Sequence, residues 1–326
     1  MTPLAHGAGT VHLLCAVHNG ERYLSDFLDS VQAQTYTDWQ LWLFNDASRD
    51  GSAALLAAAA QADARVTVLP ECDQPLGVVG AFAQLWAHVP ATAPYIGFAD
   101  QDDVWHPEKL ARSLAALRAA EAAQAEAGPL LVHTDLEVVG AALEPWAPSF
   151  WRSAGIVPEP ATLRRVVAQN VVTGCTTLMN RALYDLAGPI PLGVPMHDAW
   201  VAGVAALGGR IVAVPEATVR YRQHGANTLG ARQQVTAAPL WAQLRRGWRA
   251  LTTHGAVRQQ VAGAGVLAAT LLARFERRCT PDQRDFLTAC AAMPTLPWLA
   301  RKRAVARLYC HPEHGWLRNA GVVWRA

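Results

Sequence analysis

Short apolar runs alternate with helix-like segments between residues 11 and 134, and this alternation most constrains the fold. Apolar residues recur every three or four positions from Tyr23 to Val31, as expected for a helix packed on one face. The alternation predicts βαβ units, with a mostly parallel sheet flanked by helices and ligands bound beyond the carboxyl ends of the strands. The predicted strands cover residues 11–17, 40–44, 65–69, 95–99 and 130–134, with a later one at 210–214. Further helices are predicted over residues 52–64, over 78–88, and from Pro107 to about 127.

The C-terminal part differs in pattern and in charge. Beyond Gln233 the pattern is helical only, so we expect an α/β domain over residues 1–235 and a helical appendage over 236–326. The net charge of +2 divides into −8 for residues 1–239 and +10 for residues 240–326. A basic segment of this kind indicates an anionic partner such as nucleic acid, lipid headgroups or an acidic protein.

Tryptophans among the basic residues of this segment favour an anionic membrane surface, although a solvated helix face would look the same. The residues concerned are Trp298, Arg301, Lys302, Arg303, Arg307, Trp316 and Trp324. The uncharged run between Arg258 and Arg274 is 15 residues long, short of the roughly 20 that a spanning helix needs.

The cysteines and the N-terminus favour a cytoplasmic chain. Six cysteines lie far apart without a C-x-x-C pair, and residues 1–10 lack the basic and apolar regions of a signal peptide. Cys310, His311 and His314 are able to bind a metal, but no second cluster accompanies them, so we do not expect a zinc site there.

An acidic run directly follows the strand predicted at 95–99. In an extended chain Asp100 and Asp102 would point the same way, and two carboxylates at a strand end suit Mg²⁺ or Mn²⁺ bound together with substrate phosphates. An acidic turn that caps the helix after Pro107 is the alternative. Asp103 adds a like charge that a cation would offset.

The loop at residues 45–52 offers acceptor groups at the end of the second predicted strand. The Asp46 carboxylate can accept a base N–H, and Glu21, after the first strand, could reach a ribose or a base. A capped turn without a ligand is the alternative. The chain contains no G-x-x-x-x-G-K-[ST] motif and no G-x-G-x-x-G motif after a strand, which argues against those phosphate-binding loops.

Several motifs, in their order and spacing, resemble glycosyltransferase family 2, the inverting enzymes, and in particular its rhamnosyltransferase-like branch. Together they span about residues 11–232. They are His18-Asn19-Gly20-Glu21 within 11–24, and residues 30–36, 45–52, 100–105, 170–176, 180–183, 197–200 and 221–227.

The resemblance implies a GT-A fold, a nucleotide-diphosphate sugar, a divalent metal (Mg²⁺ or Mn²⁺) and direct displacement at the anomeric carbon. By position, Asp46 would bind a pyrimidine base, and His18 and Glu21 would line the nucleotide pocket. Asp100 and Asp102 would serve the ribose and the metal. Asp198 would be the general base, although a helix N-cap would also explain it. His224 could touch the diphosphate or the metal, with a structural histidine as the alternative.

We therefore expect an enzyme that moves a sugar, L-rhamnose being one candidate, from a dTDP or UDP donor to a glycan or lipid-linked acceptor in surface polysaccharide synthesis. It would work in the cytoplasm, at the inner face of the cell membrane, without a nucleic-acid partner. The rival hypothesis is a non-catalytic nucleotide-binding protein whose basic tail docks on nucleic acid.

Overall fold

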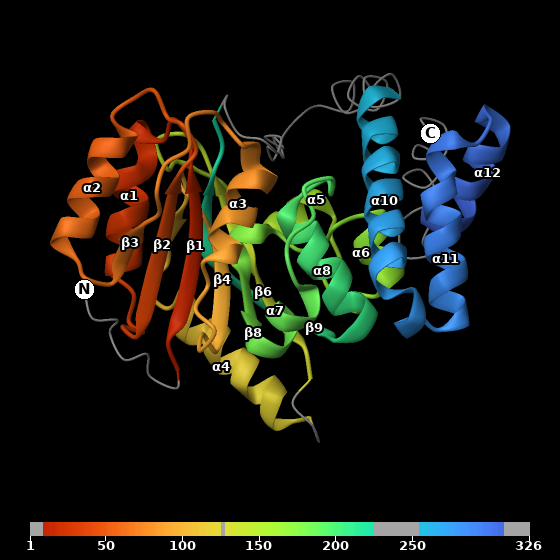
Figure 1. Cartoon of the computed structure of the whole chain (residues 1–326), viewed down its shortest axis with the longest axis horizontal. Coiled ribbons are helices and arrows are strands. Elements are labelled where there is room, and N and C mark those ends of the chain that lie inside the picture. Colours follow the sequence, from red (N-terminus) through yellow and green to blue (C-terminus); the bar gives the residue numbers. More distant parts are fainter. Residues whose placement is uncertain (1–8, 125–127, 225–253, 310–326) are drawn as a thin grey trace.

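The computed structural model describes residues 9–124, 128–224 and 254–309. Within them, the core of the molecule is a nine-stranded mixed sheet in the order β3-β2-β1-β4-β8-β6-β9-β5, with β7 paired to β6 (Figure 1). The α/β class with flanking helices and C-terminal helices is confirmed.

The N-terminal strands are parallel, as predicted. β1 pairs with β2 and β4, and β2 pairs with β3, so that their carboxyl ends share one edge. The predicted positions agree with the structure to within a residue or two. The strands are β1 (Val11–Val17), β2 (Trp39–Asn45), β3 (Val66–Val68) and β4 (Tyr95–Asp100), and the helices between them are α1 (Glu21–Gln32), α2 (Ser52–Ala62) and α3 (Gly77–Ala87).

Two apolar clusters cover the two faces of this sheet. Successive strand residues point to opposite faces, so Leu14 belongs to the cluster under α3, and Leu13 to the cluster under α1 and α2. Helix α4 (Lys109–Ala122) adds Leu117 to the second cluster, and α8 (His197–Gly208) adds Trp200 to the first. Both faces are therefore covered by helices, and the open edge lies where the strands end.

The C-terminal half of the sheet is largely antiparallel. β8 (Thr177–Asn180) runs antiparallel to β4 and β6 (Leu130–Val139), and the short β5 (Val104–Trp105) and β7 (Pro145–Ala147) also pair antiparallel. β9 (Arg210–Arg222) runs parallel to β6 and is longer than predicted. The pairing passes from Val214 directly to Ala217, so a bulge accommodates Pro215 and Glu216, just beyond the predicted end of the strand at Val214.

Short helices fill the second half of the α/β region, where none had been predicted individually. They are α5 (Phe150–Ala154), α6 (Leu163–Ala168), the 3₁₀ turn Gly174–Thr176 and α7 (Arg181–Ala187).

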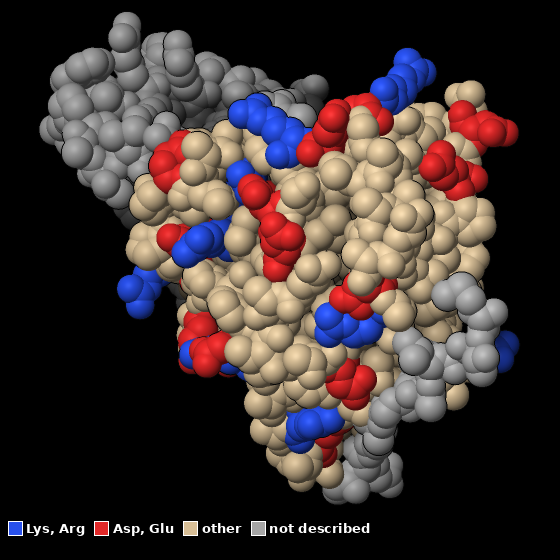
Figure 2. Space-filling view, turned by 90° about the vertical axis from the view of Figure 1, so that its left-hand side faces the viewer, with Lys and Arg blue, Asp and Glu red and all other residues tan. Residues whose placement is uncertain are grey.

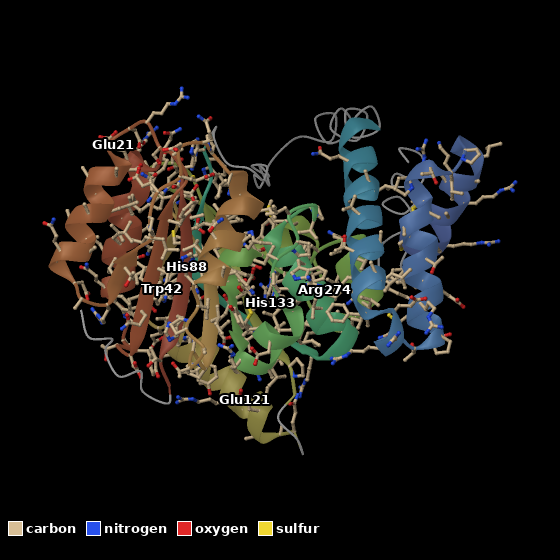
Figure 3. The ribbon with its side chains drawn as sticks, viewed as in Figure 1. Glu21, Trp42, His88, Glu121, His133 and Arg274 are labelled. Carbon is tan, nitrogen blue, oxygen red and sulfur yellow. The ribbon has the colours of Figure 1, made fainter. Side chains whose placement is uncertain are left out.

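The helices α10 (His254–Phe275), α11 (Pro281–Ala292) and α12 (Trp298–Tyr309) lie on one side of the molecule (Figure 1). α10 contacts α8 and α6, and its Arg274 reaches towards α7 and donates to the carbonyls of Ala187 and Pro189 at 2.8 and 2.9 Å (Figure 3). The apolar cluster under α3 continues into α10 and α11. The division near residue 235 stays a prediction, because residues 225–253 lie outside the described ranges.

Some predicted features also fall outside these ranges. They are residues 310–314, Trp316, Trp324 and the side chain of Trp298. No helix among the described residues combines the length and the apolar character needed to cross a membrane.

We predict that α10 contributes to the stability of the whole α/β region. Leu271 is fully buried, and its Cδ1 lies 3.0 Å from the position of a Cβ built on Gly203 of α8. Leu271→Ala should lower the free energy of unfolding by about 2–5 kcal/mol in chemical denaturation, since a cavity would remain in the core. Val266 is 43% exposed on the same helix, so Val266→Ala should change it by less than about 0.5 kcal/mol. Equal effects would show that α10 does not pack on α8 in solution.

Candidate functional site

A cavity of about 630 Å³ opens at the carboxyl ends of β1, β2 and β4. Polar loops after three separate strands contribute to it, together with the start of α8 and the end of β9. Six of the seven predicted site residues line it, namely His18, Asp46, Asp100, Asp102, Asp198 and His224.

Glu21 is the predicted residue that does not line the cavity. Its carboxylate accepts the Gly51 N–H at 3.0 Å, and its own N–H donates to Asp50 at 3.0 Å. Figure 3 places Glu21 at the outer rim of the strand ends. Glu21 thus joins the start of α1 to the loop after β2.

The same two loops are joined at further points. Asn19 has a left-handed backbone (φ 50°), and its side-chain oxygen accepts the Arg49 N–H at 2.8 Å. The N–H groups of Asn19 and Gly20 donate to the hydroxyls of Ser48 and Ser52 at 2.9 and 2.8 Å. These bonds satisfy loop amides that strand pairing cannot reach, and they fix one wall of the cavity.

Asp46 holds the first turn of α3. Its two carboxylate oxygens accept the N–H groups of Leu76 and Gly77 at 2.6 and 2.9 Å, and the residue is 4% exposed. The backbone carbonyl of Asp46 accepts a bond from His18 Nδ1 at 2.6 Å, so the His18 Nε2 is the acceptor nitrogen of that ring. Gln101 completes this wall by bonding the backbone N–H and carbonyl of His18 at 2.8 and 3.0 Å.

Three carboxyl groups crowd the end of β4. Burial, followed by the nearby Asp102 and Asp198, raises the pKa of Asp100 to about 7. Asp103 is completely buried, and burial together with Asp102 and Asp100 also raises its pKa. Possible metal-ligand atoms of Asp100, Asp103 and Cys175 lie within 4.8 Å of one another.

The chain does not stay extended through this run, as the sequence argument assumed. It turns at Gln101 and Asp102 so that β5 can begin at Val104 and pair with β9. Asp100 and Asp102 still line one cavity, but through a turn, and the turn directs Asp103 into the interior.

Two buried basic residues, Arg222 and Lys109, support the acidic turn. Neither is predicted from the sequence as a site residue. Arg222 Nε donates to the Asp102 carbonyl at 2.8 Å, and the backbone N–H of Arg222 donates to Asp103 Oδ1 at 3.0 Å. Lys109 is 1% exposed with its Nζ 3.7 Å from the centre of the Trp105 ring, and burial lowers its pKa to about 8. A lysine in the first turn of a helix resembles an ordinary surface residue, so the sequence carried no signal for Lys109.

The donor set at this edge fits a divalent cation. Asp102 Oδ2 lies 2.7 Å from His224 Nε2, and the Asp100 carboxyl lines the same cavity. Carboxylate oxygens with one imidazole suit Mg²⁺ or Mn²⁺, and a cation would offset the repulsion that raises the pKa of Asp100.

Asp198 lies in the first turn of α8 and lines the same cavity as Asp100. The N-cap position belongs to Met196, so Asp198 is not the N-cap residue. Its Oδ2 accepts the Gly174 N–H at 2.9 Å, and its Oδ1 has no hydrogen-bond partner among the described residues. Burial raises the pKa of Asp198 to about 6, which suits a group that accepts a proton near neutrality.

Residues 13–130 match the model of the Glycosyl transferase family 2. The chain is 26% identical over 169 residues to the putative teichuronic acid biosynthesis glycosyltransferase TuaG of Bacillus subtilis, covering 52% of this chain and 61% of TuaG. It spans about a third to three-fifths of the length of the curated relatives that it matches.

Two solved structures share the fold at low identity. The mannosyltransferase PcManGT from Pyrobaculum calidifontis, in complex with GDP-Man and Mn²⁺, matches with a TM-score of 0.54 and 15% identity over 97% of this chain and 85% of that one. TarS 1-349 from S. aureus, in complex with UDP-GlcNAc, matches with a TM-score of 0.51 and 12% identity over 97% of this chain and 89% of that one. The chain has the GT-A fold, and its residues 13–130 match glycosyltransferase family 2.

Proposed function

We propose that the chain is a metal-dependent, inverting glycosyltransferase that uses a nucleotide-diphosphate sugar. One observation carries the proposal. A single cavity is lined both by Asp100 and Asp102, at the end of β4, and by Asp198, whose Oδ1 is unpartnered among the described residues. Sugar transfer needs carboxylates in both roles. One set holds a metal ion near the leaving diphosphate, and another carboxylate takes the proton of the attacking hydroxyl.

In the proposed reaction the acceptor hydroxyl attacks the anomeric carbon while the bond from that carbon to the diphosphate oxygen breaks. The hydroxyl proton passes to Asp198 Oδ1, and the Gly174 N–H holds the other carboxylate oxygen. A divalent ion held by Asp100, Asp102 and His224 would stabilise the charge on the departing diphosphate. The sugar therefore changes anomeric configuration.

For the donor, we propose a UDP or dTDP sugar bound between His18 and Asp46. The Asp46 carboxylate already accepts two backbone amides, and its Oδ1 also accepts the Cys72 thiol at 3.7 Å, but its Oδ2 retains a second lone pair for the ring N–H of uracil or thymine. Glu21 would act indirectly, by holding the loop after β2. TarS binds a pyrimidine donor, UDP-GlcNAc, whereas PcManGT binds GDP-Man, so the pyrimidine proposal rests on Asp46. L-rhamnose as the transferred sugar rests on the resemblance of the motifs at residues 170–227.

For the acceptor, we propose a glycan or a lipid-linked glycan in surface polysaccharide synthesis, in line with the name of TuaG. We also propose that the enzyme acts at the cytoplasmic face of the membrane and that its basic C-terminal helices contact it. Figure 2 shows the face over α1 and α2, where acidic and basic side chains are interspersed. This face therefore lacks the predominantly basic surface that contact with an anionic membrane would need. On α12, Arg303 and Arg307 are exposed beside Leu299, which is 60% exposed.

The metal requirement is tested by donor hydrolysis. The full chain is incubated with UDP-glucose, UDP-GlcNAc or dTDP-L-rhamnose and Mn²⁺, and free sugar and nucleoside diphosphate are measured. We expect slow release that stops in excess chelator, and a similar loss in Asp102→Asn, since the like-charged pair would no longer hold the ion beside the diphosphate. Undiminished release in chelator would contradict the metal role. Binding of the nucleoside diphosphates without any sugar release would favour the non-catalytic nucleotide-binding alternative.

Asp198→Asn should separate catalysis from binding and stability. We expect unchanged donor affinity by calorimetry and transfer slowed at least about a hundredfold, as is usual when a general base is removed. In the wild type, the rate should rise with pH up to about 6, as Asp198 loses its proton.

The same variant should be more stable above that pH. Folded Asp198 keeps its proton to about pH 6, whereas the unfolded carboxyl loses it near 3.8, so this group makes the wild type less stable as the pH rises between these values. At pH 7.5 we expect Asp198→Asn to gain about 1–3 kcal/mol of unfolding free energy, while the exposed control Asp285→Asn changes little. A destabilised variant would contradict the raised pKa of folded Asp198, and a variant that turns over normally would place the base elsewhere.

The proposed membrane contact is tested by cosedimentation with vesicles. The double variant Arg303→Glu/Arg307→Glu should bind anionic phosphatidylglycerol vesicles at least about tenfold more weakly than the wild type, because each basic residue near such a surface contributes about 1 kcal/mol. Arg152 and Arg210 are exposed elsewhere, so the matched variant Arg152→Glu/Arg210→Glu should bind normally. Equal loss in both variants, or equal binding of the wild type to neutral vesicles, would contradict a specific role for α12.

A further inference from the structure

His197 is a cavity residue that the proposed reaction does not use. It is the first residue of α8, immediately before Asp198, and it lines the same cavity while being only 3% exposed. Its ring is stacked on Phe82 of α3 with centres 3.6 Å apart and planes at 17°, and it meets the Phe98 ring edge-on at 4.6 Å. Two aromatic rings from different elements therefore fix its orientation.

Neither ring nitrogen of His197 has a hydrogen-bond partner among the described residues. Burial lowers the pKa of this imidazole to about 3, so the ring stays neutral and offers one N–H donor and one acceptor nitrogen. Buried polar groups nearly always find a partner in the protein, and an exception is expected where a ligand supplies it. A phenylalanine would fill the same aromatic slot without this cost, so the imidazole is not explained by packing.

Gly174 shows which space the imidazole borders. A Cβ built on Gly174 would lie 3.1 Å from His197 Nε2 and 3.4 Å from Asp198 Oδ2. The missing side chain thus leaves His197 and the proposed base next to one small space, and all three residues line the cavity. A ligand group placed there would be within reach of both.

We propose that His197 binds a hydroxyl group of the transferred sugar and helps to select that sugar. This inference rests on the proposed function, because it concerns the donor of that reaction. A hydroxyl both donates and accepts, which matches a neutral imidazole. Two contacts favour the donor sugar over the acceptor. His197 packs on Phe98, which lies two residues before Asp100 on β4. It also packs on α3, whose first turn is held by Asp46 of the proposed nucleotide site. A site built to bond a hydroxyl discriminates strongly against sugars that lack it.

The test measures the contribution of the sugar to donor affinity. Dissociation constants of UDP and dTDP, and of UDP-glucose, UDP-GlcNAc and dTDP-L-rhamnose, are measured by calorimetry with Mn²⁺ for the full chain. The ratio between a nucleotide and its sugar conjugate is the gain from the sugar. His197→Phe should reduce that gain at least tenfold and change the affinity for the free nucleotide by less than twofold. His197→Gln, which keeps a donor and an acceptor, should recover part of the gain.

His133 provides a matched control. It is a second fully buried histidine without partners for its ring nitrogens, but it lies inside the fold against Trp151 and does not line the cavity (Figure 3). His133→Phe should leave the sugar gain unchanged. The melting temperature of His197→Phe should equal or exceed that of the wild type, because an unpaired polar group is replaced by an apolar one of similar shape.

The outcomes separate the inference from the function on which it rests. An unchanged sugar gain in His197→Phe, or an equal loss for nucleotide and sugar conjugate, would overturn the role of His197 and leave the glycosyltransferase proposal intact. If the wild type itself gained nothing from any of the three sugars, the proposed donor class would fail, and this inference with it.

Discussion

Burial of like charges at the end of β4 is the constraint on which the rest of the site depends. Asp103 is fully buried and Asp100 is partly buried beside Asp102, and burial together with Asp102 raises the pKa of both. Such a cluster persists only where cations offset it. The chain supplies two such cations. The charge of Lys109 acts on Asp103 and Asp100. Arg222 bonds the acidic turn at Asp102 and Asp103, and it also bonds Asp26 of α1 at 2.7 Å. A bound divalent ion would add a further positive charge on the cavity side.

This constraint also explains the shape of the C-terminal half of the sheet. Arg222 reaches the acidic turn only because β9 continues past Pro215 and pairs with β5. β5 in turn begins immediately after Asp103. The long β9, the short β5 and the turn at Gln101 and Asp102 are therefore parts of one device that holds three carboxyl groups in place.

Much of this was readable from the sequence, for a physical reason. The N-terminal strands and helices follow apolar periodicity, and the carboxyl ends of parallel strands meet at one edge, so Asp46 and Asp100 were brought together by topology alone. His18 was identified through the family resemblance. The roles of Asp198 and His224 needed the family resemblance, because they come from distant segments. Glu21 was placed too close to the cavity, since its bond to Gly51 has no signature in the sequence. Lys109, His197 and the extension of β9 depend on tertiary burial, which local patterns do not encode.

The central claim is that Asp198 and the acidic pair at β4 face one sugar from two sides, so that transfer is a single displacement. The most direct measurement is the anomeric configuration of the sugar first released when the full chain hydrolyses UDP-glucose or UDP-GlcNAc with Mn²⁺, followed by NMR before the anomers equilibrate. Both donors carry an α-linked sugar, and the account predicts that the β anomer appears first. Initial release of the α anomer would contradict direct displacement and the role given to Asp198.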